Sequence, residues 1–216
     1  MKNDNRKLIK ELTQNLQPVE PVKNTWPVIG KWLVIFLLCL GVGMLTPALR
    51  PDWLAMLHSP VFAMEVILLT CAALCASIAA YRLAIPDAQA NKQLSLLITV
   101  PVLIWAGFIG YYINEAMTPK VLSDIAHEPT RMCPFDMLVL SVVPGIFLFF
   151  TIKKAAPVRL GLTGMLVFLA TASFAAIGSR FLCAMDEPLH LVIWHYVPVL
   201  ILGLLGIFIG RKLLRW

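Results

Sequence analysis

The chain has 216 residues, of which 59% are hydrophobic and only 14% are charged, and its net charge is +6. Soluble domains average roughly 45–50% apolar and about 25% charged residues, so this composition excludes an ordinary soluble protein and predicts one embedded in a lipid bilayer. The excess of positive charge follows from where basic residues fall around the predicted spans, and no clustered patch for binding nucleic acid is visible.

The first twenty-five residues are polar, and we predict a short amphipathic helix within them. Leu8, Ile9, Leu12 and Leu16 recur at helical spacing, and Pro18 ends the pattern. A helix of about three turns is marginal alone in water, so its apolar stripe needs a surface to lie against. Three surfaces could serve: the lipid interface, the cytoplasmic loops of the protein itself, or a groove on a soluble partner.

Six apolar stretches follow, and each is suited to cross a bilayer as a helix, which satisfies its own backbone hydrogen bonds without water. They cover residues 29–45, 61–81, 94–113, 137–152, 160–182 and 191–210. None reads as a cleavable signal peptide. Small residues at four-residue spacing, such as Gly206 and Gly210, favour close packing of helices in lipid. The predicted fold is therefore all-α: a polytopic membrane bundle of six transmembrane helices with a short amphipathic N-terminal helix.

Basic residues gather on one side of this predicted bundle, which carries fourteen of the eighteen Lys and Arg residues. The fourteen are Lys2, Arg6, Lys7, Lys10, Lys23, Lys31, Arg82, Lys92, Lys153, Lys154, Arg159, Arg211, Lys212 and Arg215. The positive-inside rule predicts that both termini are cytoplasmic and that the connections at 46–60, 114–136 and 183–190 lie outside. Residues 1–25 then form a cytoplasmic tail, and residues 26–216 form the bundle.

Two of the five cysteines differ from the rest, because they fall at the outer ends of spans. Cys133 precedes the fourth stretch and Cys183 follows the fifth, whereas the other three lie within spans and read as small apolar filler. Arg131 and Arg180 are close enough in sequence to lower the pKa of these two thiols. Three outcomes stay open: a redox or metal switch, a structural disulfide, or two sulfurs that never meet.

Polar side chains crowd into residues 180–195, which read RFLCAMDEPLHLVIWH. His190 falls at the mouth of the sixth stretch, within reach of Cys183 and Asp186, and could be a third ligand for a thiophilic cation. His195 lies five residues further in and off the same helical face. We therefore expect His195 to be a buried histidine that a neighbouring helix satisfies.

Glu65 is an acid near the outer end of the second stretch, and we expect it either to reach water or to pair with Arg180. The chain has no phosphate-binding loop, no HExxH, GxSxG or CxxC motif and no glycine-rich dinucleotide turn, so we predict no catalytic centre and no enzyme activity. Two other classes of membrane protein remain as alternatives. One is a redox or cofactor-binding protein for electron transfer, and the other is a small solute transporter.

The order and spacing of short motifs along the whole chain resemble those of the NrsF family of six-helix membrane anti-sigma factors. The motifs are Leu8-Ile9-x-x-Leu12, Leu16-x-Pro18-Val19, Arg50-Pro51-Asp52, Arg82-Leu83-Ala84-Ile85-Pro86, Cys133, Arg180-x-x-Cys183, Trp194-His195 and Arg211-x-Leu213-Leu214-Arg215-Trp216. The resemblance implies a protein of the bacterial inner membrane that holds an extracytoplasmic-function sigma factor inactive. The implied partners are that sigma factor and the lipid bilayer, with no direct contact to nucleic acid; the oligomeric state is not predicted.

The resemblance also assigns roles to residues. The sigma-binding surface would include Leu8, Ile9, Leu12, Leu16, Pro18 and Val19. Cys133 and Cys183 would be the sensing pair for stress such as heavy metals, so that no resident cofactor is required and a regulatory metal ion would bind these thiols. Residues that could support the pair are Arg131, Arg180, Asp186 and His190. Arg6 and Lys7 stand where many members carry acids, and this departure leaves the identity of the sigma factor open.

Overall fold

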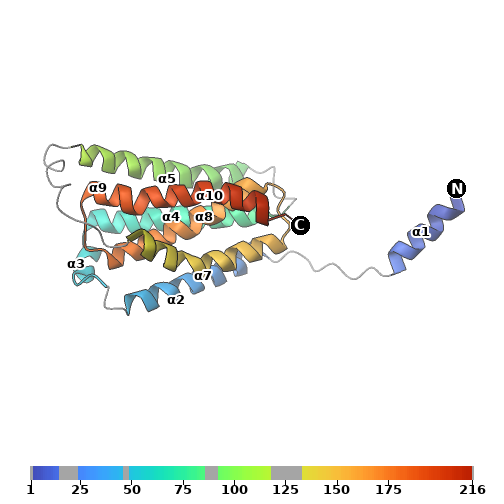
Figure 1. Ribbon diagram of the computed structural model, residues 1–216, viewed down its shortest axis with the longest axis horizontal. Coiled ribbons are helices and arrows are strands. Elements are labelled where there is room, and N and C mark those ends of the chain that lie inside the picture. The colour runs from blue at the N-terminus through green and yellow to red at the C-terminus, as the bar shows by residue number, and fades with distance from the viewer. Residues whose placement is uncertain (1, 15–23, 46–48, 86–91, 118–132, 216) are drawn as a thin grey trace.

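The computed structural model describes residues 2–14, 24–45, 49–85, 92–117 and 133–215, which form helices and the connections between them (Figure 1). Within these residues, six helical segments are long and apolar enough to cross a membrane, which confirms the predicted all-α bundle of six spans. The elements are α1 (Lys2–Gln14), α2 (Thr25–Met44), α3 (Trp53–Leu57), α4 (Pro60–Leu83), α5 (Lys92–Ala116), α7 (Cys133–Lys154), α8 (Leu160–Leu182), α9 (Pro188–Leu191), the π-helical η3 (Val192–Tyr196) and α10 (Val197–Leu213).

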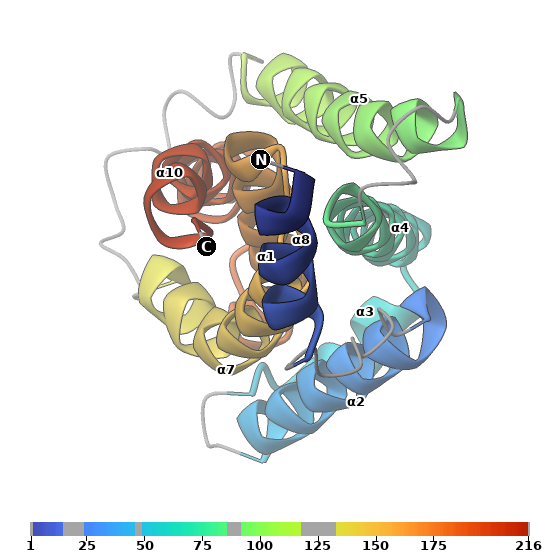
Figure 2. The same ribbon diagram turned by 90° about the vertical axis from the view of Figure 1, so that its right-hand side faces the viewer.

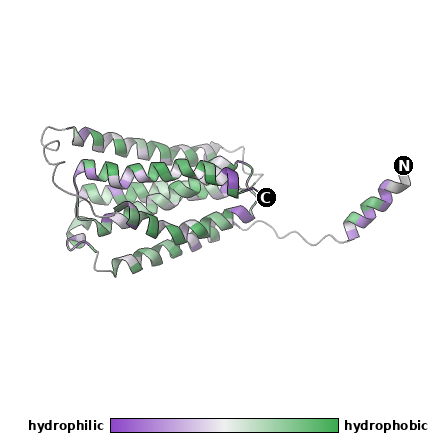
Figure 3. Ribbon diagram, in the orientation of Figure 1, coloured by the Kyte–Doolittle hydropathy of each residue, from purple (hydrophilic) through white to green (hydrophobic). Residues whose placement is uncertain are grey.

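The span α8 has the predicted bounds, whereas the other five spans are somewhat longer than the predicted apolar stretches, because several helices continue into polar residues. The fourth stretch, for example, extends from Cys133 to Lys154 in α7. The elements α9, η3 and α10 run on as one continuous span, Pro188–Leu213. Figure 3 shows the apolar residues along the length of the helices and hydrophilic ones nearer their ends.

The helix α8 lies at the centre of the bundle, with α10, α4, α7 and α2 packed around it (Figure 2). Of its membrane-spanning window 72% is buried, against 39% or less in every other span. Small side chains make this central place possible, since they let neighbouring backbones approach closely in lipid. A Cβ atom on Gly206 of α10 would lie 2.6 Å from the carbonyl oxygen of Gly164 in α8, so glycine is required at that contact.

The helix α1 lies apart from the bundle in Figure 1. It confirms the predicted N-terminal helix, and its apolar stripe is open to solvent: Leu8, Ile9 and Leu12 are 55%, 60% and 65% exposed. The other predicted members of the sigma-binding surface, Leu16, Pro18 and Val19, lie outside the described residues.

The alternating directions of the helices give the bundle two ends. The C-terminal end holds the last turns of α4, α7 and α10, and each of these turns carries basic side chains. The opposite end holds α3, the start of α7, the end of α8 and α9, and we call it the α3 end (Figure 1). The cysteine and histidine residues considered below lie at the α3 end.

Candidate metal centre

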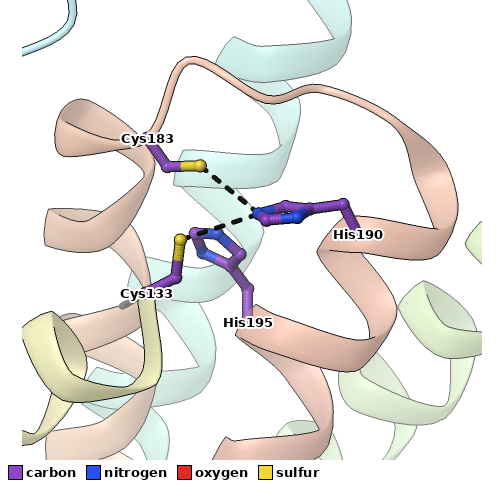
Figure 4. A group of neighbouring side chains, drawn as sticks. All are labelled: Cys133, Cys183, His190 and His195. Atoms are coloured by element: carbon purple, nitrogen blue, oxygen red, sulfur yellow. Dashed lines mark hydrogen bonds between the residues drawn. The ribbon is translucent and has the colours of Figure 1, made fainter. Parts of the chain in front are cut away.

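Four side chains from three spans converge at the α3 end (Figure 4). Cys133 begins α7, Cys183 follows the last residue of α8, His190 lies in α9 and His195 lies in η3. One sulfur or nitrogen atom from each residue can be chosen so that all four atoms lie within 4.8 Å of one another. The Nε2 atom of His190 is 3.6 Å from the Cys133 sulfur and 3.4 Å from the Cys183 sulfur.

The two cysteines are adjacent, buried and free of a disulfide in this structure. The sequence left three outcomes open for these cysteines, and the outcome in which the two sulfurs never meet is therefore wrong. A hydrogen bond from the Cys133 thiol, followed by one from His190, lowers the pKa of the Cys183 thiol. Because the thiolate is the form that reacts with oxidants and binds metals, this arrangement favours chemistry at Cys183.

His195 is placed differently from its prediction. It is fully buried as expected, and no hydrogen bond of regular geometry reaches its ring nitrogens among the described residues, although the ring interacts with the Cys183 thiol. Its ring instead lies 5.5 Å from the ring of His190, centroid to centroid, and faces the two sulfurs (Figure 4). The expectation that a neighbouring helix satisfies His195 holds only for this interaction with Cys183, which follows α8, and His195 joins the cluster.

The π-helical turn explains this difference. In a regular α-helix, residues five apart point roughly 140° away from each other, which is why the sequence pattern separates His190 from His195. Pro198 has no N–H and cannot donate the α-helical hydrogen bond to the carbonyl of Trp194. The N–H of Val197 bonds to the carbonyl of Val192, five residues earlier, and the wider turn brings His195 round toward His190.

Ion pairs hold the backbone beside the cluster. Arg50 is 1% exposed; its Nε lies 2.8 Å from Asp52, one terminal nitrogen lies 2.8 Å from Asp186, and the other donates to the carbonyl of Cys183 at 3.1 Å. Hydrogen bonds to Asp52 and Asp186 raise the pKa of Arg50, and the bond from Arg50 lowers the pKa of Asp52. Burial acts to raise the pKa of Asp186, but the hydrogen bond from Arg50 and the charge of Arg180 outweigh it and lower that pKa.

A second set of contacts links this region to the interior of the bundle. Arg180 lies 3.0 Å from Glu65 and 2.9 Å from Asp186, so the predicted pairing of Glu65 with Arg180 is confirmed. The hydroxyl groups of Tyr196 and Tyr112 also donate to the carboxylate of Glu65. Tyr196 follows His195 directly in η3, so one helical turn contributes both to the thiol cluster and to the buried ion pair.

The structure brings some of the predicted support residues to the cluster and sets others beside it. His190 contacts both sulfurs, whereas Arg180 and Asp186 pair with other charged groups. Arg131 lies outside the described residues. Sequence reasoning missed Arg50 as a site residue, although the Arg-Pro-Asp motif that contains it was a signal.

The donor atoms define what the cluster can do. Thiolate sulfur and imidazole nitrogen are the ligands that soft and borderline cations prefer, and two adjacent thiols can also be oxidised to a disulfide. Four protein ligands would fill a tetrahedral site. A metal site filled in this way has no open position for a substrate, unlike a catalytic zinc site.

Comparison with known proteins identifies a family that matches most of the chain. Residues 12–216 match the model of the family NrsF, described as negative regulator of sigma F. A curated relative, the probable anti-sigma-F factor NrsF of Azospira oryzae, is 29% identical over 159 residues, which are 73% of each chain. No solved structure matches the chain.

Proposed function

The chain belongs to the NrsF family of negative regulators of sigma F, and on this basis we propose that it is a membrane anti-sigma factor whose helix α1 holds an extracytoplasmic-function sigma factor inactive at a bacterial inner membrane. The family supports a sigma factor as partner, and the relative in Azospira oryzae carries the corresponding name. The type of sigma factor and the role of α1 are the parts we add.

The observation that carries the role of α1 is its uncovered apolar stripe. Leu8, Ile9 and Leu12 are all more than half exposed, on a helix that stands apart from the bundle (Figure 1). A helix with one such stripe can bind in an apolar groove of a folded partner. Each Leu or Ile buried there contributes about 1.5–3 kcal/mol to the free energy of binding. The family match begins at Leu12, within this helix, and runs to the last residue of the chain.

The distribution of charge supports a cytoplasmic position for α1. The last turns of α4, α7 and α10 carry Arg82, Lys154 and Arg211, and these turns lie at the same end of the bundle. By the positive-inside rule this end faces the cytoplasm, and the α3 end with its thiols faces outward. The sigma factor and the sensing residues are then on opposite sides of the membrane.

We assign the sensing of stress to Cys133 and Cys183. Binding of a heavy metal, or oxidation of the two thiols, would draw the start of α7 toward the end of α8. Moving a two-state equilibrium from mostly bound to mostly released requires a difference of about 5.5 kcal/mol between the states. Bonds to two buried sulfurs can supply a difference of that size, whereas exposed ion pairs contribute about 1 kcal/mol or less.

Copurification tests the role of α1. The tagged wild-type chain should retain a sigma factor, identified by mass spectrometry, whereas Leu8→Asp and Leu12→Asp should each reduce its recovery at least about tenfold, because a charge enters the apolar contact. Gln14→Asp adds the same charge on the opposite face of α1 and should leave recovery unchanged. Equal recovery from all four chains would remove the proposal.

A further inference from the structure

We propose that Cys133, Cys183, His190 and His195 form a tetrahedral site for a closed-shell cation of the zinc class, Zn²⁺ or Cd²⁺, with both histidines as direct ligands. As a sensing site this inference rests on the function proposed above, since it names the ligand that the thiols detect. As a binding site it rests on the geometry alone.

The spacing of the donor atoms matches such a site. Zinc bonds are about 2.3 Å long to sulfur and about 2.0–2.1 Å to nitrogen, so ligand atoms at the corners of a tetrahedron lie roughly 3.3–3.8 Å apart. The two sulfurs lie 3.6 and 3.4 Å from the Nε2 atom of His190, inside this range. The fourth ligand, from His195, completes a set within 4.8 Å, so shifts of about 1 Å bring all four atoms onto one cation.

The state of His195 is the second observation that points to a ligand. Both ring nitrogens are buried, the residue is 0% exposed, and neither nitrogen makes a hydrogen bond of regular geometry among the described residues; the group that interacts with the ring is the Cys183 thiol, itself a ligand of the proposed site. A buried polar atom left without a well-formed hydrogen bond is destabilising. A cation held between His195 and the sulfurs removes that destabilisation, and the ring of His195 already faces the sulfurs (Figure 4).

The charges around the cluster favour a divalent cation over other ligands. Two thiolates neutralise a divalent cation, so the occupied site carries no net charge in a buried position. The ligand set contains no carboxylate, and three of the nearby acids, Asp52, Asp186 and Glu65, are engaged with Arg50 and Arg180. Calcium and magnesium require oxygen ligands, so this set excludes them.

The ligands come from three spans, and this gives binding a structural consequence. Cys133 belongs to α7, Cys183 follows α8, and both histidines belong to the span that continues into α10. One cation would therefore tie three of the six spans together at the α3 end. His190, which is 9% exposed, is the most accessible of the four and marks the side from which a cation enters.

Metal binding to the full chain in detergent, with the thiols kept reduced, tests the site. We expect one Cd²⁺ per chain, and Co²⁺ as a probe should show sulfur-to-metal charge transfer together with the visible bands of a tetrahedral ion. His190→Asn and His195→Asn should each weaken Cd²⁺ binding at least about tenfold, since even residues that only orient a ligand change metal affinity about 10–100-fold. Cys133→Ser and Cys183→Ser should weaken Cd²⁺ binding further.

Matched controls are available within the chain. His58 is an exposed histidine near α3, and Cys75 lies within α4; His58→Asn and Cys75→Ser should bind Cd²⁺ as the wild type does. If the histidine variants of the cluster bind as tightly as these controls, the imidazoles are not ligands and the proposal is wrong.

A measurement on the wild type guards against variants that fail to fold. X-ray absorption of the Zn²⁺-loaded chain should show two sulfur atoms at about 2.3 Å and two nitrogen atoms at about 2.0–2.1 Å. A shell of four sulfurs, or one without sulfur, would overturn the site. Copurification of the sigma factor separates the two proposals: a sigma factor retained by a chain that binds no metal removes this inference alone, and metal bound by a chain that retains no sigma factor removes the proposed function alone.

Discussion

Glu65 and Arg180 form an ion pair within the buried part of the bundle, with side chains 1% and 3% exposed. Transfer of such charges out of water is costly, and the cost is met only where hydrogen bonds satisfy both groups. Hydrogen bonds satisfy both groups in this pair: Tyr196 and Tyr112 donate to the carboxylate of Glu65, and Asp186 accepts from the guanidinium of Arg180. The pair therefore depends on residues from α4, α5, α8 and η3 at once.

We predict that Glu65→Gln destabilises the bundle by about 3–5 kcal/mol, because it removes one of the two acids that pair with the buried Arg180 among the described residues and leaves Asp186. Thermal unfolding in detergent, followed by loss of helical circular dichroism, measures the change. Asp52→Asn is the control: its side chain is 49% exposed and Arg50 keeps Asp186, so the effect should be much smaller. Equal losses of thermal stability in the two variants would show that the buried pair contributes no more to stability than the exposed one.

Individual residues of the site differ in how far the sequence predicts them. Cys133, Cys183 and His190 stand out because polar side chains are rare in so apolar a chain, and the structure brings these three together. The pairing of Glu65 with Arg180 follows from the high cost of unpaired charge in lipid. His195 was missed, because counting helical faces assumes an α-helix throughout, and the turn that contains it is a π-helix.

At the scale of the element, η3 is the part of the fold that shapes the site. Turns of this kind are rare and are often found at functional sites, since one extra residue per turn redirects the side chains that it carries. In η3 the redirected side chains are His195, which faces the thiols, and Tyr196, which holds Glu65. A change in this turn would therefore act on both groups together.

Pro198→Ala tests the origin of the turn. The alanine restores an N–H that can bond to the carbonyl of Trp194, so the π-helical turn should relax toward an α-helix and carry His195 away from the sulfurs. We predict that Cd²⁺ binding to the full chain weakens at least about tenfold, as it does when a ligand is misplaced.

The same substitution in another span provides the control. Pro101→Ala alters a proline within α5 and should leave Cd²⁺ affinity unchanged. An affinity that is likewise unchanged in Pro198→Ala would mean either that the proline does not hold the π-helical turn or that His195 is not a ligand, and X-ray absorption of that variant separates the two.

The elements themselves were predictable where one physical requirement dominates. Every apolar stretch became a span, because lipid leaves backbone groups no partner outside their own helix. The central place of α8 was not predictable from its hydropathy, which resembles that of the other spans. It depends on which small residues meet: Gly164 fits against Gly206 only when α8 and α10 lie together, and a single sequence does not show such pairs.

For the whole molecule, the central position of α8 connects the two ends of the bundle. Cys183 follows its last residue at the α3 end, and its first turn lies at the C-terminal end beside α10. Packed interiors do not deform continuously, so a shift of α8 at one end must be met by repacking at the other. This gives the proposed signal a physical basis without requiring a single chain of contacts.

Thermodynamic linkage makes the connection between the ends measurable. If Cd²⁺ at the α3 end weakens the hold of α1 on the sigma factor by some factor, the bound sigma factor must weaken Cd²⁺ binding by the same factor. We predict this equality when Cd²⁺ is titrated into the full chain with and without saturating sigma factor, and when sigma-factor affinity is measured with and without Cd²⁺. Leu12→Asp, which we expect to bind the sigma factor at least about tenfold more weakly, should show a smaller difference in Cd²⁺ affinity at the same sigma-factor concentration. Release of the sigma factor by Cd²⁺ with no reciprocal change would place the action of the metal elsewhere, for instance on the sigma factor itself.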